Sequence, residues 1–262
     1  MDRNNASVSH ESDAAMSFAL EKVRELAVHI RDATVSDECV WFRNLLLGIL
    51  NSALLDYAYS DIGAKQNSPY LLAWSCRNLL ELKVITAYVL GSAKNAGDFK
   101  NDFVIDVKEF YEAITNYHKA AYPKLLSAWS DVIRKSDGAM KEALEAARRR
   151  EVERGPQTEA TDAETETYRR LMIEFGISEN AKPKRAGQIA RSIHQHEQFE
   201  PMFKVCSKIM HRTTLSIASS VVKGGLAEII PLLSNTAACE LLSIHELVSK
   251  YFEERGVRPP EN

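Results

Sequence analysis

The segment from Pro69 to Ser92 constrains the fold more than any other part of this chain. Apolar residues occupy almost every side of the helix that the segment would form. Asn67 and Ser68 precede Pro69 in a pattern that commonly opens a helix, with proline in the first turn. A helix that is apolar all round has to be covered by neighbouring elements. We therefore expect a bundle with this helix at its centre.

Apolar residues recur at helical spacing over most of the remaining sequence, and no alternating strand pattern competes with this spacing. The 11 glycines and 8 prolines fall mostly at breaks between such segments. The pattern predicts an all-α protein, a multi-helix bundle of long antiparallel helices. The expected helices span residues 12–33, 36–65, 69–92, 98–122, 123–135, 161–175, 182–197, 202–222 and 235–254.

A charged stretch at residues 139–166 departs from this pattern. It has few apolar residues and contains the arginines from Arg148 to Arg150, followed by Gly155-Pro156. Such a composition is typical of a solvated helical arm, which we expect to reach a protein partner. The predicted organisation is a tail and first helix at 1–37, a single helical bundle domain at 38–254 with the solvated insertion at 139–166, and a flexible tail at 255–262.

Charge and hydropathy exclude several classes of protein. The net charge is −3, so no overall basic field indicates nucleic acid, and any such contact has to come from a local patch. The N-terminus lacks a signal-peptide pattern, and every apolar stretch is interrupted well before 18 residues. We expect a cytoplasmic protein with no membrane segment.

The sequence contains no motif for a metal or a cofactor. Its cysteines form no Cys-x-x-Cys pair and lie among apolar residues, which predicts buried reduced thiols for Cys39, Cys76, Cys206 and Cys239. Glycine-rich phosphate loops and dinucleotide fingerprints do not occur. We therefore expect neither a metal site nor a cofactor.

Two apolar helices carry polar residues four positions apart, a spacing that places both on one helix face. Arg77 and Glu81 occupy the central helix, and Ser207 and His211 occupy the helix expected at 202–222. If the two helices pack together, the four groups would meet, and Glu81 would orient the imidazole. Such a polar centre is either catalytic or a network that specifies the packing.

These two segments, Arg77–Glu81 and Phe203–His211, resemble an uncharacterised family of all-helical bacterial proteins. That family pairs an Arg-x-x-x-Glu helix with a later Ser-x-x-x-His helix. Its general form resembles HEPN domains, which include metal-independent ribonucleases and modules of defence or toxin systems. The resemblance covers about residues 38–222, and it implies RNA as a partner and a homodimer that builds the site.

The resemblance also implies roles for individual residues. Arg77 would hold the scissile phosphate, and His211 would act as general acid or base on the 2′-hydroxyl path. The HEPN motif itself places a histidine four to six residues after an arginine on one helix. Arg191 and His196 have this spacing, and they form an alternative catalytic pair.

Basic residues surround these positions in the sequence. Such a surface binds phosphates by releasing counterions, and its alternative interpretation is a solvated face balanced by Glu197 and Glu200. The predicted nucleic-acid-binding residues are Lys184, Arg185, Lys204, Lys208 and Arg212.

Two main hypotheses follow. The first is a HEPN-like, metal-independent endoribonuclease of a bacterial defence or toxin system. The second is a non-catalytic interaction or regulatory protein, in which the Arg77–Glu81–Ser207–His211 network is structural. Ligand sensing in a helical pocket is a third.

Overall fold

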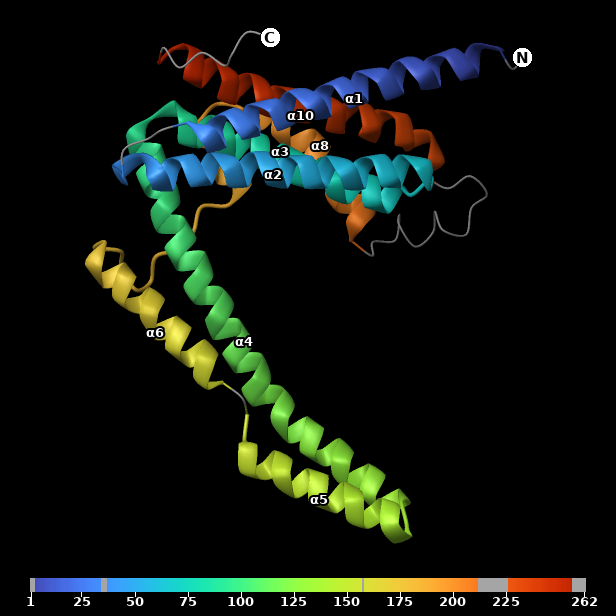
Figure 1. Cartoon of the computed structure of the whole chain (residues 1–262), viewed down its shortest axis with the longest axis vertical. Coiled ribbons are helices and arrows are strands. Elements are labelled where there is room, and N and C mark those ends of the chain that lie inside the picture. The colour runs from blue at the N-terminus through green and yellow to red at the C-terminus, as the bar shows by residue number, and fades with distance from the viewer. Residues whose placement is uncertain (1–2, 34–36, 157, 212–225, 256–262) are drawn as a thin grey trace. The chain divides into compact units, whose positions relative to one another are not determined.

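The computed structural model describes residues 3–33, 37–156, 158–211 and 226–255, and every regular element in this part of the chain is helical (Figure 1). The predicted all-α bundle is thereby confirmed. The elements are α1 (Arg3–Asp32), α2 (Asp37–Lys65), α3 (Pro69–Gly91), α4 (Ala93–Lys135), α5 (Gly138–Arg154), α6 (Glu159–Glu174), α7 (Ala186–Ser192), α8 (His196–Met210), the 3₁₀ turn η1 (Ala227–Ile229) and α10 (Ile230–Glu253).

The chain divides into two compact units. The bundle unit consists of Met1–Ala96 and Arg185–Asn262, and the inserted unit is Gly97–Lys184. These bounds differ from the predicted ones in two respects. The insertion is longer than the charged stretch 139–166, because the apolar side of α4 also belongs to it. The first helix belongs to the bundle, since α1 packs on α2 and α10.

The centre of the bundle unit is α3, as its sequence predicts. Ser68 caps the helix by accepting a hydrogen bond from the Leu71 N–H at 3.4 Å, and Pro69 occupies the first turn. Around α3 lie α2, α7, α8 and α10. The largest fully buried side chains come from α3 and these neighbours, together with α1: Tyr57, Ile30, Leu46, Leu50, Leu72, Leu79, Ile189, Ile209, Leu233, Leu241 and Ile244.

Two predicted helix breaks at proline are wrong. Pro123 lies inside the continuous helix α4, and Pro201 lies inside α8. A proline within a helix removes one backbone hydrogen bond and crowds the preceding turn. In α4 the adjacent turn is held from outside, because the Tyr122 hydroxyl donates to the Glu151 carbonyl of α5 at 2.9 Å.

The basic helix expected at 182–197 is also wrong. Only Ala186–Ser192 is helical there, and α8 then begins at His196. His194 separates the two helices with a φ of 59°, a left-handed conformation that a right-handed helix cannot contain. The helix expected at 202–222 is described as far as Met210, and residues 212–225 lie outside the described part of the chain.

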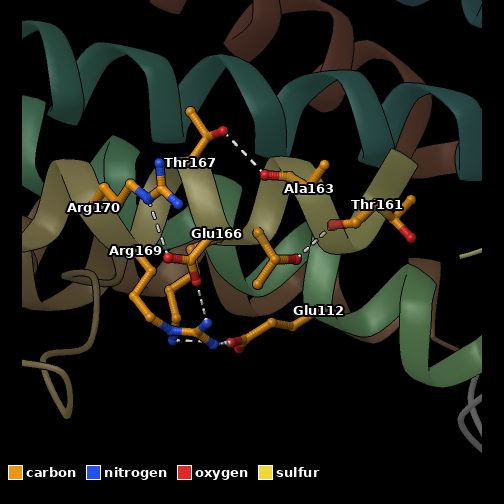
Figure 2. A network of polar contacts seen from close by, with 9 residues as sticks. Glu112, Thr161, Ala163, Glu166, Thr167, Arg169 and Arg170 are labelled. Carbon is orange, nitrogen blue, oxygen red and sulfur yellow. Dashed lines mark hydrogen bonds and ion pairs between the residues drawn. The ribbon is translucent and has the colours of Figure 1, made fainter. Parts of the chain in front are cut away.

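The inserted unit has a small core and a network of polar contacts between α4 and α6. Val104, Ile105 and Met172 form the core. Arg169 of α6 contacts Glu166 at 2.9 Å and Glu112 of α4 at 3.4 Å (Figure 2). By contrast, none of the residues of α5 is buried, so the apolar core of this unit lies between α4 and α6.

Candidate functional site

The helices α3 and α8 pack against each other, which is the condition for the predicted polar centre, and they run antiparallel. Arg77 contacts Phe203, while Leu80 and Val84, further along α3, line a small cavity with Phe199, which comes earlier in α8. Later residues of α3 therefore lie beside earlier residues of α8. This register determines where the predicted site residues lie.

The predicted contact between Arg77 and Glu81 is confirmed. Arg77 Nε lies 3.1 Å from Glu81 Oε1, and the two side chains are 26% and 32% exposed. The guanidinium also stacks on the Phe203 ring, with its Cζ 4.6 Å from the ring centroid. The ion pair uses only Nε of a group that has five N–H donors. Arg77 is thus held in place at a partly open edge between α3 and α8.

Ser207 and His211 lie further along α8. Ser207 is one helical turn beyond Phe203 and half-buried, and His211 is the exposed residue that ends the helix. The His211 N–H donates to the Ser207 carbonyl at 3.0 Å. At about 1.5 Å per residue, His211 lies about 12 Å along the axis from Phe203, toward the start of α3. The register therefore separates the two predicted pairs. Arg77 and Glu81 are in contact, whereas His211 lies toward the start of α3, on the side of Arg77 away from Glu81, and is not placed for Glu81 to orient its imidazole.

A buried polar pair that the sequence pattern did not predict lies between α2 and α3. Asn78 Nδ2 donates to Asp56 Oδ1 at 2.9 Å, and Asp56 is 7% exposed. Burial raises the pKa of Asp56, the hydrogen bond from Asn78 opposes this rise, and the charge of Glu81 adds to it. A single aspartate within the apolar stripe of α2 was the available signal.

A second missed pair joins α3 to α10. Lys83 Nζ lies 2.9 Å from Glu240 Oε2, and Glu240 is almost fully buried. Glu240 interrupts an apolar run in the sequence, which was the signal for a buried partner. The polar residues of α3 thus reach three neighbours: Asn78 reaches α2, Arg77 reaches α8 and Lys83 reaches α10.

The cysteines behave in two ways. Cys76 and Cys206 are fully buried, and they contact each other across α3 and α8. The hydrogen bond with Cys206 and burial raise the pKa of the Cys76 thiol, so Cys76 stays protonated at neutral pH. The prediction was wrong for Cys39 and Cys239, which are exposed because they lie on outward faces of α2 and α10. All four are free thiols.

The alternative pair does not share a helix. Arg191 is near the end of α7, and His196 is the first residue of α8. Arg191 Nη2 instead lies 2.6 Å from Glu200 Oε1, which lowers the pKa of this carboxyl group. The helix that was to align Arg191 with His196 is absent from this described stretch.

The predicted nucleic-acid-binding residues are distributed over both units. Lys184 belongs to the inserted unit, where its Nζ lies 3.0 Å from Asp98 Oδ2 and its N–H donates to Asp102. Arg185, Lys204 and Lys208 are exposed on the bundle unit. The fifth predicted residue, Arg212, lies outside the described residues.

Within the described part of the chain, no group of three or more histidine, cysteine or acidic residues is arranged to hold a metal ion. No described helix combines the length and the apolar content that a bilayer span requires. Comparison with known proteins gave no match to this chain among protein-family models, curated proteins or solved structures.

Proposed function

We propose that this chain is a HEPN-like helical protein that cleaves RNA without a metal ion at the edge between α3 and α8. The observation that supports the proposal is the antiparallel α3–α8 contact, which holds Arg77 on Phe203 with four of its N–H donors outside the ion pair. Ser207 and His211 follow Phe203 along α8. A cytoplasmic location and a role in a bacterial defence or toxin system belong to the same proposal.

Arg77 would bind one phosphate of the RNA backbone through two parallel N–H donors, a geometry that guanidinium groups favour. The scissile phosphate would lie further along the α3–α8 edge, at His211, about 12 Å from Phe203. The 2′-hydroxyl oxygen would then attack phosphorus, and the bond to the 5′-oxygen would break. His211 would take the proton of the 2′-hydroxyl and return it to the leaving oxygen. Glu81 would position Arg77 without touching the RNA.

The test is cleavage of a broad RNA panel with chelator present, by the wild type and by His211→Ala and Arg77→Gln variants that circular dichroism shows to be folded. His118→Ala, in the inserted unit, is the matched control, and His196→Ala tests the alternative pair. The proposal requires that His211→Ala and Arg77→Gln each lose at least about 100-fold in rate, with His118→Ala unchanged. RNA that stays intact with wild-type protein rejects it.

A specific observation favours a second candidate function, a non-catalytic interaction or regulatory protein. Asn78, Arg77 and Lys83 each contact a different neighbouring helix. Polar groups distributed in this way fix the packing of a central helix. This candidate predicts that Arg77→Gln lowers the free energy of unfolding, while no RNA cleavage occurs in the wild type.

A further inference from the structure

The inserted unit contains an open groove between α4 and α5, with a volume of about 570 Å³. Its charged lining residues are the cations Arg134, Lys141, Arg148 and Arg149 and the carboxylate Glu145. The lining therefore carries a surplus of positive charge on a chain whose net charge is −3. Such a local excess raises the concentration of anions at the groove.

One donor in this groove lacks an acceptor. The Nε–H of Arg148 is shielded from solvent and has no hydrogen-bond partner among the described residues. A shielded donor without an acceptor is costly, and a rotation of the Arg148 side chain toward a bound anion would relieve this cost. Arg134 does have a partner, Asp131, at 2.8 Å, but both side chains are largely exposed and such a pair contributes little.

The spacing of the cations suits a chain of phosphates. Arg148 and Arg149 follow Lys141 by seven and eight residues along α5. The three cations therefore extend over about 10–12 Å of the helix axis. The phosphates of one strand of a double helix advance by about 3.4 Å along its axis, so this row spans about three of them. Arginine binds phosphate oxygens with two parallel N–H donors.

We propose that the α4–α5 groove binds the phosphate backbone of a nucleic acid. Small-molecule sites are mostly apolar with a few polar groups, whereas this groove is lined mainly by charged side chains. The inference does not depend on the reaction proposed at α3–α8, because the groove lies wholly within the inserted unit. It also involves none of the five basic residues predicted from the sequence.

The test is fluorescence anisotropy with labelled single- and double-stranded RNA and DNA, using the full chain between 50 and 300 mM salt. The groove triple variant is Lys141→Gln, Arg148→Gln and Arg149→Gln. The control triple variant, Lys124→Gln, Lys135→Gln and Arg150→Gln, removes the same charge from positions that do not line the groove. We expect the groove variant to lose about tenfold or more in affinity and its log–log salt slope to fall by about 2. The control variant should stay within about twofold of the wild type.

Three outcomes would overturn the inference. Wild-type protein that binds none of the probes at 50 mM salt would do so, and so would an equal loss of affinity in both triple variants. The third is a competition in which polyglutamate displaces the labelled RNA at the same concentration as unlabelled RNA of equal charge. That result would assign the groove to an acidic protein partner instead. The His211→Ala variant separates the two proposals, because it should bind RNA normally even where cleavage is lost.

Discussion

Arg77 of α3 lies over the ring of Phe203 of α8, with its Cζ 4.6 Å from the ring centroid. A double-mutant cycle with Arg77→Met and Phe203→Leu should give a coupling free energy of about 1–2 kcal/mol from urea unfolding, because the contact is partly shielded from water. Lys22 and Phe18 form the matched control, since their contact is longer, at 5.6 Å, and Phe18 is exposed. Their coupling should be about 0.5 kcal/mol or less, and equal values for both pairs would contradict the prediction.

The buried pair of Asp56 and Asn78 should make stability depend on pH. Asn78→Ala leaves the Asp56 carboxylate buried without its hydrogen-bond donor. We therefore expect the free energy of unfolding to fall by about 1–3 kcal/mol at pH 7. The folded protein holds the Asp56 proton more tightly than the unfolded chain, because burial raises this pKa. Stability from Asp56 is therefore greatest in acid and falls as pH rises through the raised pKa.

Asn78→Ala removes the hydrogen bond that lowers the pKa of Asp56. The loss in free energy of unfolding caused by this variant should therefore be smaller at pH values where Asp56 is protonated. Thermal unfolding between pH 3.5 and 8 measures this dependence. Asp56→Asn is the control background, because it removes the charge. If Asn78→Ala lowers the free energy of unfolding of the Asp56→Asn protein as much as that of the wild type, the charge of Asp56 has no part in the effect.

Tyr57 provides a second pH-dependent contribution. Burial, with a smaller contribution from Asp61, raises its pKa to about 12, while the unfolded chain has the ordinary value near 10. The unfolded state then releases the proton first, so wild-type stability should fall by about 2–3 kcal/mol between pH 10 and 12. Tyr57→Phe should lose this dependence in denaturant titrations. Tyr59→Phe, on an exposed part of the same helix, should retain it.

At neutral pH, Tyr57→Phe should cost no more than about 1 kcal/mol. The Tyr57 hydroxyl is buried with no hydrogen-bond partner among the described residues, so its removal also removes a desolvation penalty. A loss of several kcal/mol would show that the hydroxyl has a partner in the folded protein.

Two glycines of α2 should respond in opposite directions to alanine. A Cβ at Gly63 would lie 3.0 Å from Leu72 Cγ and 3.1 Å from the Leu72 backbone nitrogen, whereas a Cβ at Gly48 would meet nothing within 4 Å. Gly48→Ala should stabilise the protein by about 0.5–1 kcal/mol through helix propensity. Gly63→Ala should destabilise it by about 1–3 kcal/mol through overpacking. Equal melting shifts for the two variants would contradict the close α2–α3 approach.

Thiol accessibility checks the α3–α8 interface directly. Cys39 and Cys239 are exposed, whereas Cys76 and Cys206 are fully buried. Iodoacetamide should therefore modify two cysteines in the native protein and all four in urea, since reaction requires access and thiolate. Peptide mass spectrometry identifies the sites. Rapid native modification of Cys206 would show that α8 separates from α3.

The sequence predicted the helical class and the central position of α3, because these follow from apolar periodicity and local capping. It also predicted the Arg77–Glu81 contact, which follows from helical geometry alone. The predicted breaks at Pro123 and Pro201 were wrong because neighbouring elements decide whether a helix tolerates a lost hydrogen bond. The catalytic roles of Arg77, Glu81, Ser207 and His211 stay predictions.

The partners of individual polar groups were decided by tertiary structure. Asn78 donates a hydrogen bond to Asp56, which is 22 positions earlier in the chain, and Lys83 forms an ion pair with Glu240 on the last helix. The groove between α4 and α5 likewise arises only when two helices lie side by side. Periodicity in a sequence determines which face of a helix is buried, since it depends on local geometry. Which helix covers that face depends on the packing of the whole unit, and the sites between helices follow from that packing.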